Sequence, residues 1–245
     1  TQQAGTAITA GNLKLISTGG DVTLNNTGNN VAIVAAALTG ASSLSYVDAN
    51  ALSIGTVAAA GTGAANLAQV IGIVATGADA TVSVTSLTAT LTVDDVVTTN
   101  SGDVTLLATA GAIVVDADIT TTDGKATLTA GTTIDSTANG NIITTGKNDA
   151  VQGTDGGEVL LRSTGAGAIT LLGNITANGG NTTAGANNGG AAGVVTILNA
   201  SGLIVVDDIT ATGGTAFGAP GVAGANGTVQ LSATSTITQQ AGTAI

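Results

Sequence analysis

The sequence contains no cysteine and no histidine, so it offers no disulfide, no thiol nucleophile and no imidazole base. The usual ligands of a structural zinc site are missing for the same reason. Aromatic residues make up only 1% of the chain, which excludes a core built from large rings. Proline occurs once, and the 37 glycines follow no Gly-X-Y period, so a collagen triple helix is excluded as well.

Positive charge and long apolar runs are also scarce. Four Lys and Arg residues stand against fifteen Asp and Glu residues, giving a formal net charge of -11. Nucleic acid and anionic membrane would both be repelled, so we expect no nucleic-acid partner. Apolar runs such as 31–38 are far shorter than the roughly 18 residues that suggest a membrane span, so we expect no membrane insertion.

The most informative feature present is an exact repeat. Residues 1–8, TQQAGTAI, recur letter for letter as residues 238–245, and the two copies start 237 residues apart. A fixed period of this kind is typical of tandem arrays. We therefore interpret 1–245 as a single segment holding one 237-residue period and the first eight residues of the next. The alternative is two copies of a local motif that cap one domain.

A shorter period lies inside the long one. A glycine is repeatedly followed by alternating apolar residues, which is the pattern of a strand with one buried face. The segments are Gly20–Leu24, Gly102–Leu106, Gly124–Leu128, Gly157–Leu161, Gly193–Ile197 and Gly227–Leu231. Two further apolar positions follow most of them, as at Ile113 and Ile119, which indicates three short strands per unit.

The length of this unit favours a winding chain over a hairpin meander. One unit spans 22 residues from Val104 to Ala126, enough for three strands and three turns. Stacked units would form interior ladders of Val, Ile and Leu. The sequence therefore predicts an all-β parallel β-helix (β-solenoid) of about ten coils, on the order of 50 Å long. The coil boundaries within 31–77 stay open, because this region is less regular.

The third strand of several units ends in a glycine. We expect this glycine to adopt a positive φ and so to turn the chain.

Three units are lengthened at one equivalent place, after the third strand. The insertions are 146–157, 179–193 and 213–227, and the last two are rich in Gly, Ala and Asn. Their composition predicts flexible extruded loops. Their shared position predicts that they lie along one edge of the rod.

Candidate chemistry is sparse. Asp94 and Asp95 could meet Asp116 and Asp118 of the next coil around a Ca²⁺ ion, although solvated corner carboxylates are the default interpretation. A glycosidase or lyase usually stacks its sugar substrate on aromatic side chains, and the only two here, Tyr46 and Phe217, lie far apart in sequence. The one arginine, Arg162, offers little charge stabilisation at a reacting centre. We expect no enzyme, and assign no catalytic residue, no cofactor-binding residue, no metal ligand and no cofactor.

Outward threonines suggest one further activity. The pairs Thr120/Thr122 and Thr210/Thr212 could form a flat hydroxyl grid of the kind that ice-binding β-solenoids display. Threonine is also an ordinary outward residue on a strand, and Asn178 occupies the equivalent place in another unit. Ice binding is therefore a lower alternative.

The recurring Gly-Asp-Val-Thr-Leu and Ile-Thr-Ala-x-Gly-Gly patterns make the chain resemble filamentous-haemagglutinin-like and autotransporter-type bacterial surface proteins. The resemblance implies a right-handed β-helical rod that is extracellular or displayed at the cell surface. We expect a structural repeat of a long fibre, sheath or adhesin stalk, whose partner is a further copy of itself. The alternative is an adhesin that binds a host or matrix surface through the loops 179–193 and 213–227.

Overall fold

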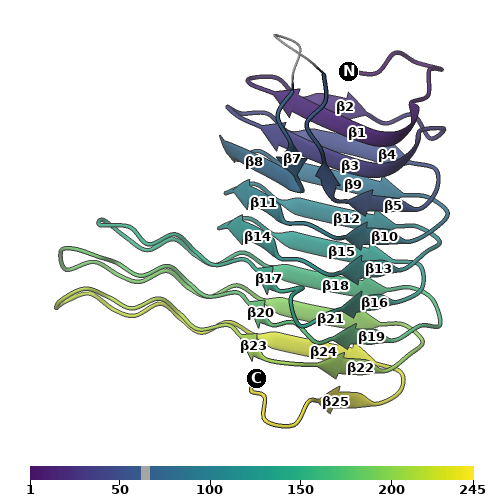
Figure 1. Cartoon of the computed structure of the whole chain (residues 1–245). Helices are drawn as coiled ribbons and strands as arrows, with labels where there is room; N and C mark the ends of the chain where they lie inside the picture. Colours follow the sequence, from purple (N-terminus) through teal and green to yellow (C-terminus); the bar gives the residue numbers. More distant parts are fainter. Residues whose placement is uncertain (62–66) are drawn as a thin grey trace.

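The computed structural model describes residues 1–61 and 67–245, which wind as a parallel β-helix (Figure 1). Each regular coil contributes one short strand to each of three faces, as the sequence predicts. Strands of successive coils pair in parallel, so their hydrogen bonds run along the axis of the rod. In the described ranges no helix is long and apolar enough to span a membrane.

The three faces are named here by the order in which the chain visits them. Face 1 is an eight-stranded sheet: β2 (Val22–Leu24), β4 (Leu44–Asp48), β9 (Val82–Ser86), β12 (Val104–Ala108), β15 (Ala126–Ala130), β18 (Val159–Ser163), β21 (Val195–Asn199) and β24 (Val229–Ala233). Face 2 holds β5 (Leu52–Ile54), β10 (Leu91–Val93), β13 (Ile113–Val115), β16 (Ile134–Ser136), β19 (Ile169–Leu171), β22 (Ile204–Val206) and β25 (Ile237–Gln239). Face 3 holds β8 (Ile73–Ala78), β11 (Val97–Asn100), β14 (Ile119–Thr122), β17 (Ile142–Ile143), β20 (Ile175–Thr176) and β23 (Ile209–Thr210).

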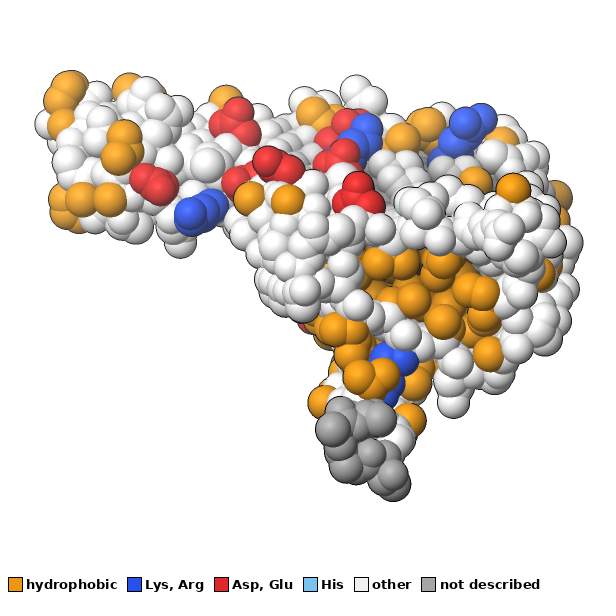
Figure 2. Space-filling model, turned by 90° about the horizontal axis from the view of Figure 1, so that it is seen from above, with side chains coloured by type: hydrophobic (Ala, Val, Ile, Leu, Met, Phe, Trp, Pro, Cys, Tyr) orange, Lys and Arg blue, Asp and Glu red, His pale blue; other side chains and the backbone are white. Residues whose placement is uncertain are grey.

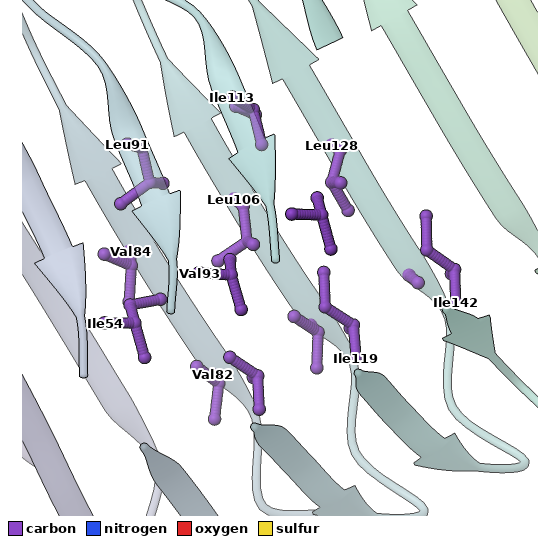
Figure 3. Packing of buried hydrophobic residues seen from close by; sticks show 14 of the residues in the cluster. Ile54, Val82, Val84, Leu91, Val93, Leu106, Ile113, Ile119, Leu128 and Ile142 are labelled. Carbon is purple, nitrogen blue, oxygen red and sulfur yellow. The ribbon is translucent and has the colours of Figure 1, made fainter. Parts of the chain in front are cut away.

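Aliphatic side chains stack in columns inside the coil (Figure 3). Strands alternate buried and outward residues, so a constant register places like residues over like. The face 2 column is Leu52, Leu91, Ile113, Ile134, Ile169 and Ile204. These residues are at most 2% exposed, and the narrow interior explains why the chain uses aliphatic side chains in place of rings.

The region whose boundaries the sequence leaves open contains two irregularities. Strand β3 (Asn30–Leu38) runs across a corner, pairing with β5 on face 2 and with β8 on face 3. Strand β1 (Thr9–Ser17) follows it along most of its length, so faces 2 and 3 merge there. A small antiparallel hairpin, β6 (Thr56–Val57) and β7 (Val70–Ile71), is inserted before β8.

The expectation of about ten coils is too high, because face 1 contains eight strands.

The glycine that begins each Gly-x-Val strand serves a purpose other than the one expected. In two of these units positive φ occurs one residue before the glycine, at Ser101 (65°) and Asp123 (66°). A Cβ on Gly124 would lie 2.2 Å from the carbonyl oxygen of Gly102 in the coil before it. Glycine is thus required at this corner because the backbones of stacked coils approach closely.

Candidate functional surfaces

Three arms project from one edge of the rod, between face 3 and face 1 (Figure 1). Arm 1 is 146–157, arm 2 is 179–193 and arm 3 is 213–227, the same insertions that the sequence singles out. Each arm leaves the coil and returns to it, and the three arms lie one over another in the order of their coils (Figure 1). Their position on one edge is confirmed.

The arms are joined by backbone hydrogen bonds that recur at three-residue spacing. Arm 1 donates to arm 2 and to the residue just before it, and arm 2 donates in the same way to arm 3 and to the residue just before it. The bonds include Gly146 N to Asn178 O (2.7 Å), Asp149 N to Asn181 O (3.1 Å), Gly179 N to Thr212 O (2.9 Å) and Thr182 N to Thr215 O (3.0 Å). A three-residue repeat is that of a polyproline II backbone, which makes no internal hydrogen bonds and leaves its groups free for neighbours.

Glycines allow the arm backbones to pack directly on one another. Gly190 lies at the centre, where its amide donates to Gly180 O (2.8 Å) and its carbonyl accepts from Gly214 N (2.8 Å). A Cβ on Gly190 would lie 1.8 Å from the carbonyl oxygen of Thr154. The arms are thus an ordered stack of extended backbones, and the prediction of flexible loops is wrong. Composition suggested a linker because glycine gives no side-chain signal for packing.

Outward Asn and Asp side chains form a second ladder along the axis, which the sequence reading missed. The side-chain oxygen of one coil accepts a hydrogen bond from the backbone amide of the next coil. Examples are Asp118 to Asn141 N (3.2 Å), Asn141 to Asn174 N (2.8 Å), Asn148 to Asn181 N (2.7 Å) and Asn181 to Thr215 N (2.7 Å). The recurrence of Asn at coil-length intervals, 33 residues from Asn148 to Asn181, was the available signal.

Three of the four candidate calcium carboxylates accept hydrogen bonds from neighbouring donors. Asp95 accepts from the Thr56 hydroxyl at 2.6 Å, and Asp118 accepts from the Asn141 side-chain amide at 2.8 Å. Asp94 accepts from the hydroxyl of Ser53. No group of three or more Asp or Glu residues that could hold a metal ion occurs in 1–61 and 67–245. In the described coil Asp94, Asp95 and Asp118 each accept from a protein donor, and nothing in the arrangement of the four carboxylates favours calcium.

The two aromatic residues lie in unrelated environments. Tyr46 is buried inside the N-terminal coils and donates from its hydroxyl to Asp48 Oδ2 at 2.7 Å. Burial, with the carboxylate beside it, raises the pKa of the Tyr46 phenol far above its usual value. Asp48 is itself fully buried and also accepts from Val31 N at 2.8 Å. Phe217 lies exposed on arm 3, so the two rings form no joint surface.

The buried polar groups of this corner were not found from the sequence. Asn29 is fully buried and its side-chain amide donates to the carbonyls of Leu24 (3.1 Å) and Val47 (3.0 Å). Every buried side-chain nitrogen and oxygen of the described residues has a hydrogen-bond partner. These groups satisfy the backbone of tight corners, which is a structural use.

The outward threonines do not form a continuous grid. The column that contains Thr120 runs Thr98, Thr120, Ile143, Thr176 and Thr210 along face 3. Ile143 interrupts it, and the middle threonine of β14, Thr121, points inward and is buried. Arg162 stands exposed on β18 of face 1.

Both ends of the coil leave core side chains uncovered. Figure 2 looks down on the N-terminal end and shows hydrophobic side chains gathered over it. Leu13 and Leu15 of β1 are only half-buried there, and Ile16 is 49% exposed. At the other end Ile237 and Ile245 are 44% and 57% exposed, against 0% for the equivalent Ile113 and Ile119 of a middle coil. The ends present sheet edges and apolar cross-sections with no cap in the described residues.

Comparison with known proteins gives no relative. No protein-family model, no curated protein and no solved structure matches the chain. The fold assignment rests on the strand pairing itself.

Proposed function

We propose that the chain is a structural β-solenoid repeat, one period of a tandem array that builds a long extracellular fibre, sheath or adhesin stalk on a bacterial surface. The observation that carries the proposal is the placement of the repeated octapeptide at the C-terminal end. Its second copy continues the coil, with β25 paired on β22 and Ile209 N bonded to Ala244 O at 2.9 Å. A further copy would therefore begin in phase with the coil that precedes it.

The remaining features support a mechanical role. Stacked coils form one continuous column of aliphatic side chains, and axial hydrogen bonds link every neighbouring pair of regular coils. Solenoids of this kind are stabilised by nearest-neighbour contacts, so adding copies lengthens the rod without a new core. The resemblance to filamentous-haemagglutinin-like and autotransporter-type surface proteins, together with the net charge of -11, favours a location outside the cell.

Imaging a longer array tests this function. Four consecutive copies should form a straight rod of about 150 Å, from eight coils per copy at roughly 4.8 Å each. Negative-stain electron microscopy would measure that length. Beads of one copy each on flexible connections would overturn the proposal. A single 1–245 chain imaged in parallel gives the reference particle.

A second candidate is adhesion through the arms, and the exposed apolar side chains of the arms favour it. Phe217 and Val222 of arm 3 are 54% and 63% exposed. Such residues on a rigid projection offer a contact point for a host or matrix surface. Replacing Phe217 and Val222 with serine leaves the glycine stack in place, so the double variant should lose attachment while keeping its fold. Unchanged attachment would exclude this role.

Ice binding remains the lowest alternative, because Ile143 interrupts the hydroxyl column of face 3. A thermal-hysteresis measurement tests it. The absence of hysteresis would end the idea.

A further inference from the structure

The repeated octapeptide takes the same local conformation at both ends. The Thr6 hydroxyl donates to Gln3 O at 2.7 Å, and the equivalent Thr243 hydroxyl donates to Gln240 O at 2.7 Å. The glycine in each turn has positive φ, 76° at Gly5 and 87° at Gly242. The segment is thus one local unit whose shape does not depend on which end it occupies.

The two copies nevertheless lie on different faces of the coil. In the first copy, Gln2 N donates to Thr23 O at 2.9 Å, which places Gln2 over β2 on face 1. In the second copy, the equivalent Gln239 pairs with Val206 on face 2. Ile245 then reaches face 3 beside Ile209, since each face 3 amide bonds the residue before its partner. The N-terminal copy is therefore displaced by one face relative to the C-terminal copy.

The sequence after the octapeptide fits the C-terminal placement. Ile8-Thr9-Ala10 repeats the face 3 sequence Ile209-Thr210-Ala211, and Gly11-Asn12-Leu13-Lys14-Leu15 repeats the face 1 pattern Gly227-Thr228-Val229-Gln230-Leu231. A further seven residues separate Leu15 from Val22, as they separate Leu106 from Ile113 between face 1 and face 2. In an array, Leu13 and Leu15 therefore belong on face 1.

The described chain places these leucines elsewhere. Leu13 pairs with Val34 and Leu15 pairs with Ala36, within the strand β1 that crosses faces 2 and 3. Face 1 is occupied instead by β2, with Val22 paired to Leu44 and Leu24 paired to Tyr46. Within residues 1–61 and 67–245, no strand pairs with the outer edge of β1 or β2, over which only the backbone at Gln2 bonds to Thr23.

The C-terminal end of the coil has a groove that residues Thr9 and Ala10 of a following copy could occupy. It measures about 390 Å³ and continues from Ile245 along the unpaired edge of face 3 to the start of β24. It is lined by Ile209, Thr210, Ala211, Asn226, Val229 and Ile245. The residues that follow Ile245 in an array are Thr9 and Ala10 of the next copy, so the groove fits a second copy of this chain.

We propose that residues 9–34 have two pairings and that a preceding copy selects the second one. This inference rests on the tandem array proposed above. In the second pairing, Thr9 and Ala10 fill the groove on face 3, and Leu13 and Leu15 pair with Val229 and Leu231 on face 1. Leu44 and Tyr46 then receive Leu13 and Leu15 in place of Val22 and Leu24. Val22 and Leu24 move to face 2 over β5, so the part of β3 that pairs with β5 gives up that pairing, while its end stays on face 3 against β8. The exchange covers these leucines on both sides, where β1 leaves them half-buried.

Engineered disulfides distinguish the two pairings, and the absence of cysteine gives a clean background. Neighbouring strand residues lie within the Cα separation of about 4.4–6.8 Å that a disulfide requires. Thr23→Cys with Ser45→Cys reports the described pairing, in which these residues are partners. Lys14→Cys with Ser45→Cys reports the second pairing. Each pair is placed in chain 1–245 and in the second copy of a two-copy chain, residues 1–237 followed by 1–245.

We expect the Thr23–Ser45 cross-link in the single chain, its loss in the two-copy chain, and a Lys14–Ser45 cross-link in the two-copy chain alone. Thr105→Cys with Thr127→Cys, which are partners in the middle of face 1, should cross-link in both chains and shows that the coil is folded. Persistence of the Thr23–Ser45 cross-link in a two-copy chain that electron microscopy shows as one straight rod would overturn the switch and leave the array intact. Two separately tumbling bodies would overturn the array itself, and the switch with it.

Discussion

The coil and its arms stack at the same axial repeat but use different interactions. In the coil, each neighbouring pair of strands is backed by fully buried aliphatic side chains such as Leu106 and Leu128. In the arms, bare glycine backbones contact one another and almost no apolar side chain is buried. The coil therefore combines hydrogen bonds with the hydrophobic effect, whereas the arms depend on hydrogen bonds and close backbone contact.

The comparison shows how one chain extends a stack beyond its core. A net hydrogen bond contributes only about 0.5–1.5 kcal/mol, so an arm lacking buried side chains needs many of them in register. The three arms obtain that register from the coils that carry them. We expect the arms to open more readily than the coil, and the variants below test that difference.

The largest effect is expected in the coil. Leu128→Ala removes a fully buried side chain from the face 1 column and should lower the free energy of unfolding by about 2–5 kcal/mol, since a cavity remains. Guanidinium unfolding measures the change. Thr127→Ala, on the outward side of the same strand, is the control and should stay within about 0.5 kcal/mol. Equal losses for both variants would contradict a core made of stacked aliphatic side chains.

Tyr46→Phe probes the polar part of the same core. It removes a hydrogen bond to the buried Asp48 carboxylate, which should cost about 1.5–3 kcal/mol. The wild-type protein should also lose stability as the pH rises above about 10, because the phenol ionises first in the unfolded state. Urea unfolding at pH 7 and pH 11 measures both effects. An alkaline loss of the same size in Tyr46→Phe would show that the phenol is not its source.

Gly190→Ala is the corresponding test in the arms. The added Cβ would overlap the Thr154 carbonyl, so the arms must separate locally, at a cost of about 1–3 kcal/mol. Hydrogen exchange should become faster at arm amides such as Gly214 and stay unchanged at β15. Gly19→Ala, where a Cβ meets nothing within 4 Å, is the matched control. Faster amide exchange at β15 than at the arm amides in this variant would contradict the comparison.

The smallest effect is expected from the side-chain ladder. Asn181→Ala removes the acceptor of the Thr215 amide (2.7 Å) and hydroxyl (3.0 Å), which should cost about 1 kcal/mol in local opening. Asn181→Asp keeps an acceptor oxygen and should restore most of the protection. Amide exchange at Thr215 separates the two variants. Identical exchange in both would show that the ladder adds nothing to the stacked backbones.

The coil was predictable because its signal repeats without change of register. Val104 and Ala126 begin strands 22 residues apart, and each strand alternates with period two, so a single interpretation fits many units. The region around β3 resisted prediction because its nine residues run through a corner as one strand. No periodicity marks a strand that serves two faces.

The arms were located correctly and their order was missed. Glycine at a three-residue spacing, at Gly218, Gly221, Gly224 and Gly227, was present in the sequence. A glycine-rich composition is also typical of a flexible linker. Glycine packs through its backbone alone, so its contacts can be recognised only once the neighbouring backbone is placed. The polar corner of Tyr46 and Asp48 was missed for a related reason: these two side chains bond to each other along one strand, and the backbone amide of Val31 that completes the corner comes from another strand.

Because the hydrogen bonds lie parallel to the rod, tension applied at its two ends would load them one layer at a time. Each coil that unfolds would lengthen the chain by the extended length of its own residues. A plain layer such as Val104 to Ala126 holds 22 residues and would add about 75 Å, at roughly 3.4 Å per residue. The layer from Val159 to Val195 holds 36 residues and would add about 120 Å by the same measure. The coils that carry the arms, from β17 onward, would thus release the longest segments of chain under tension.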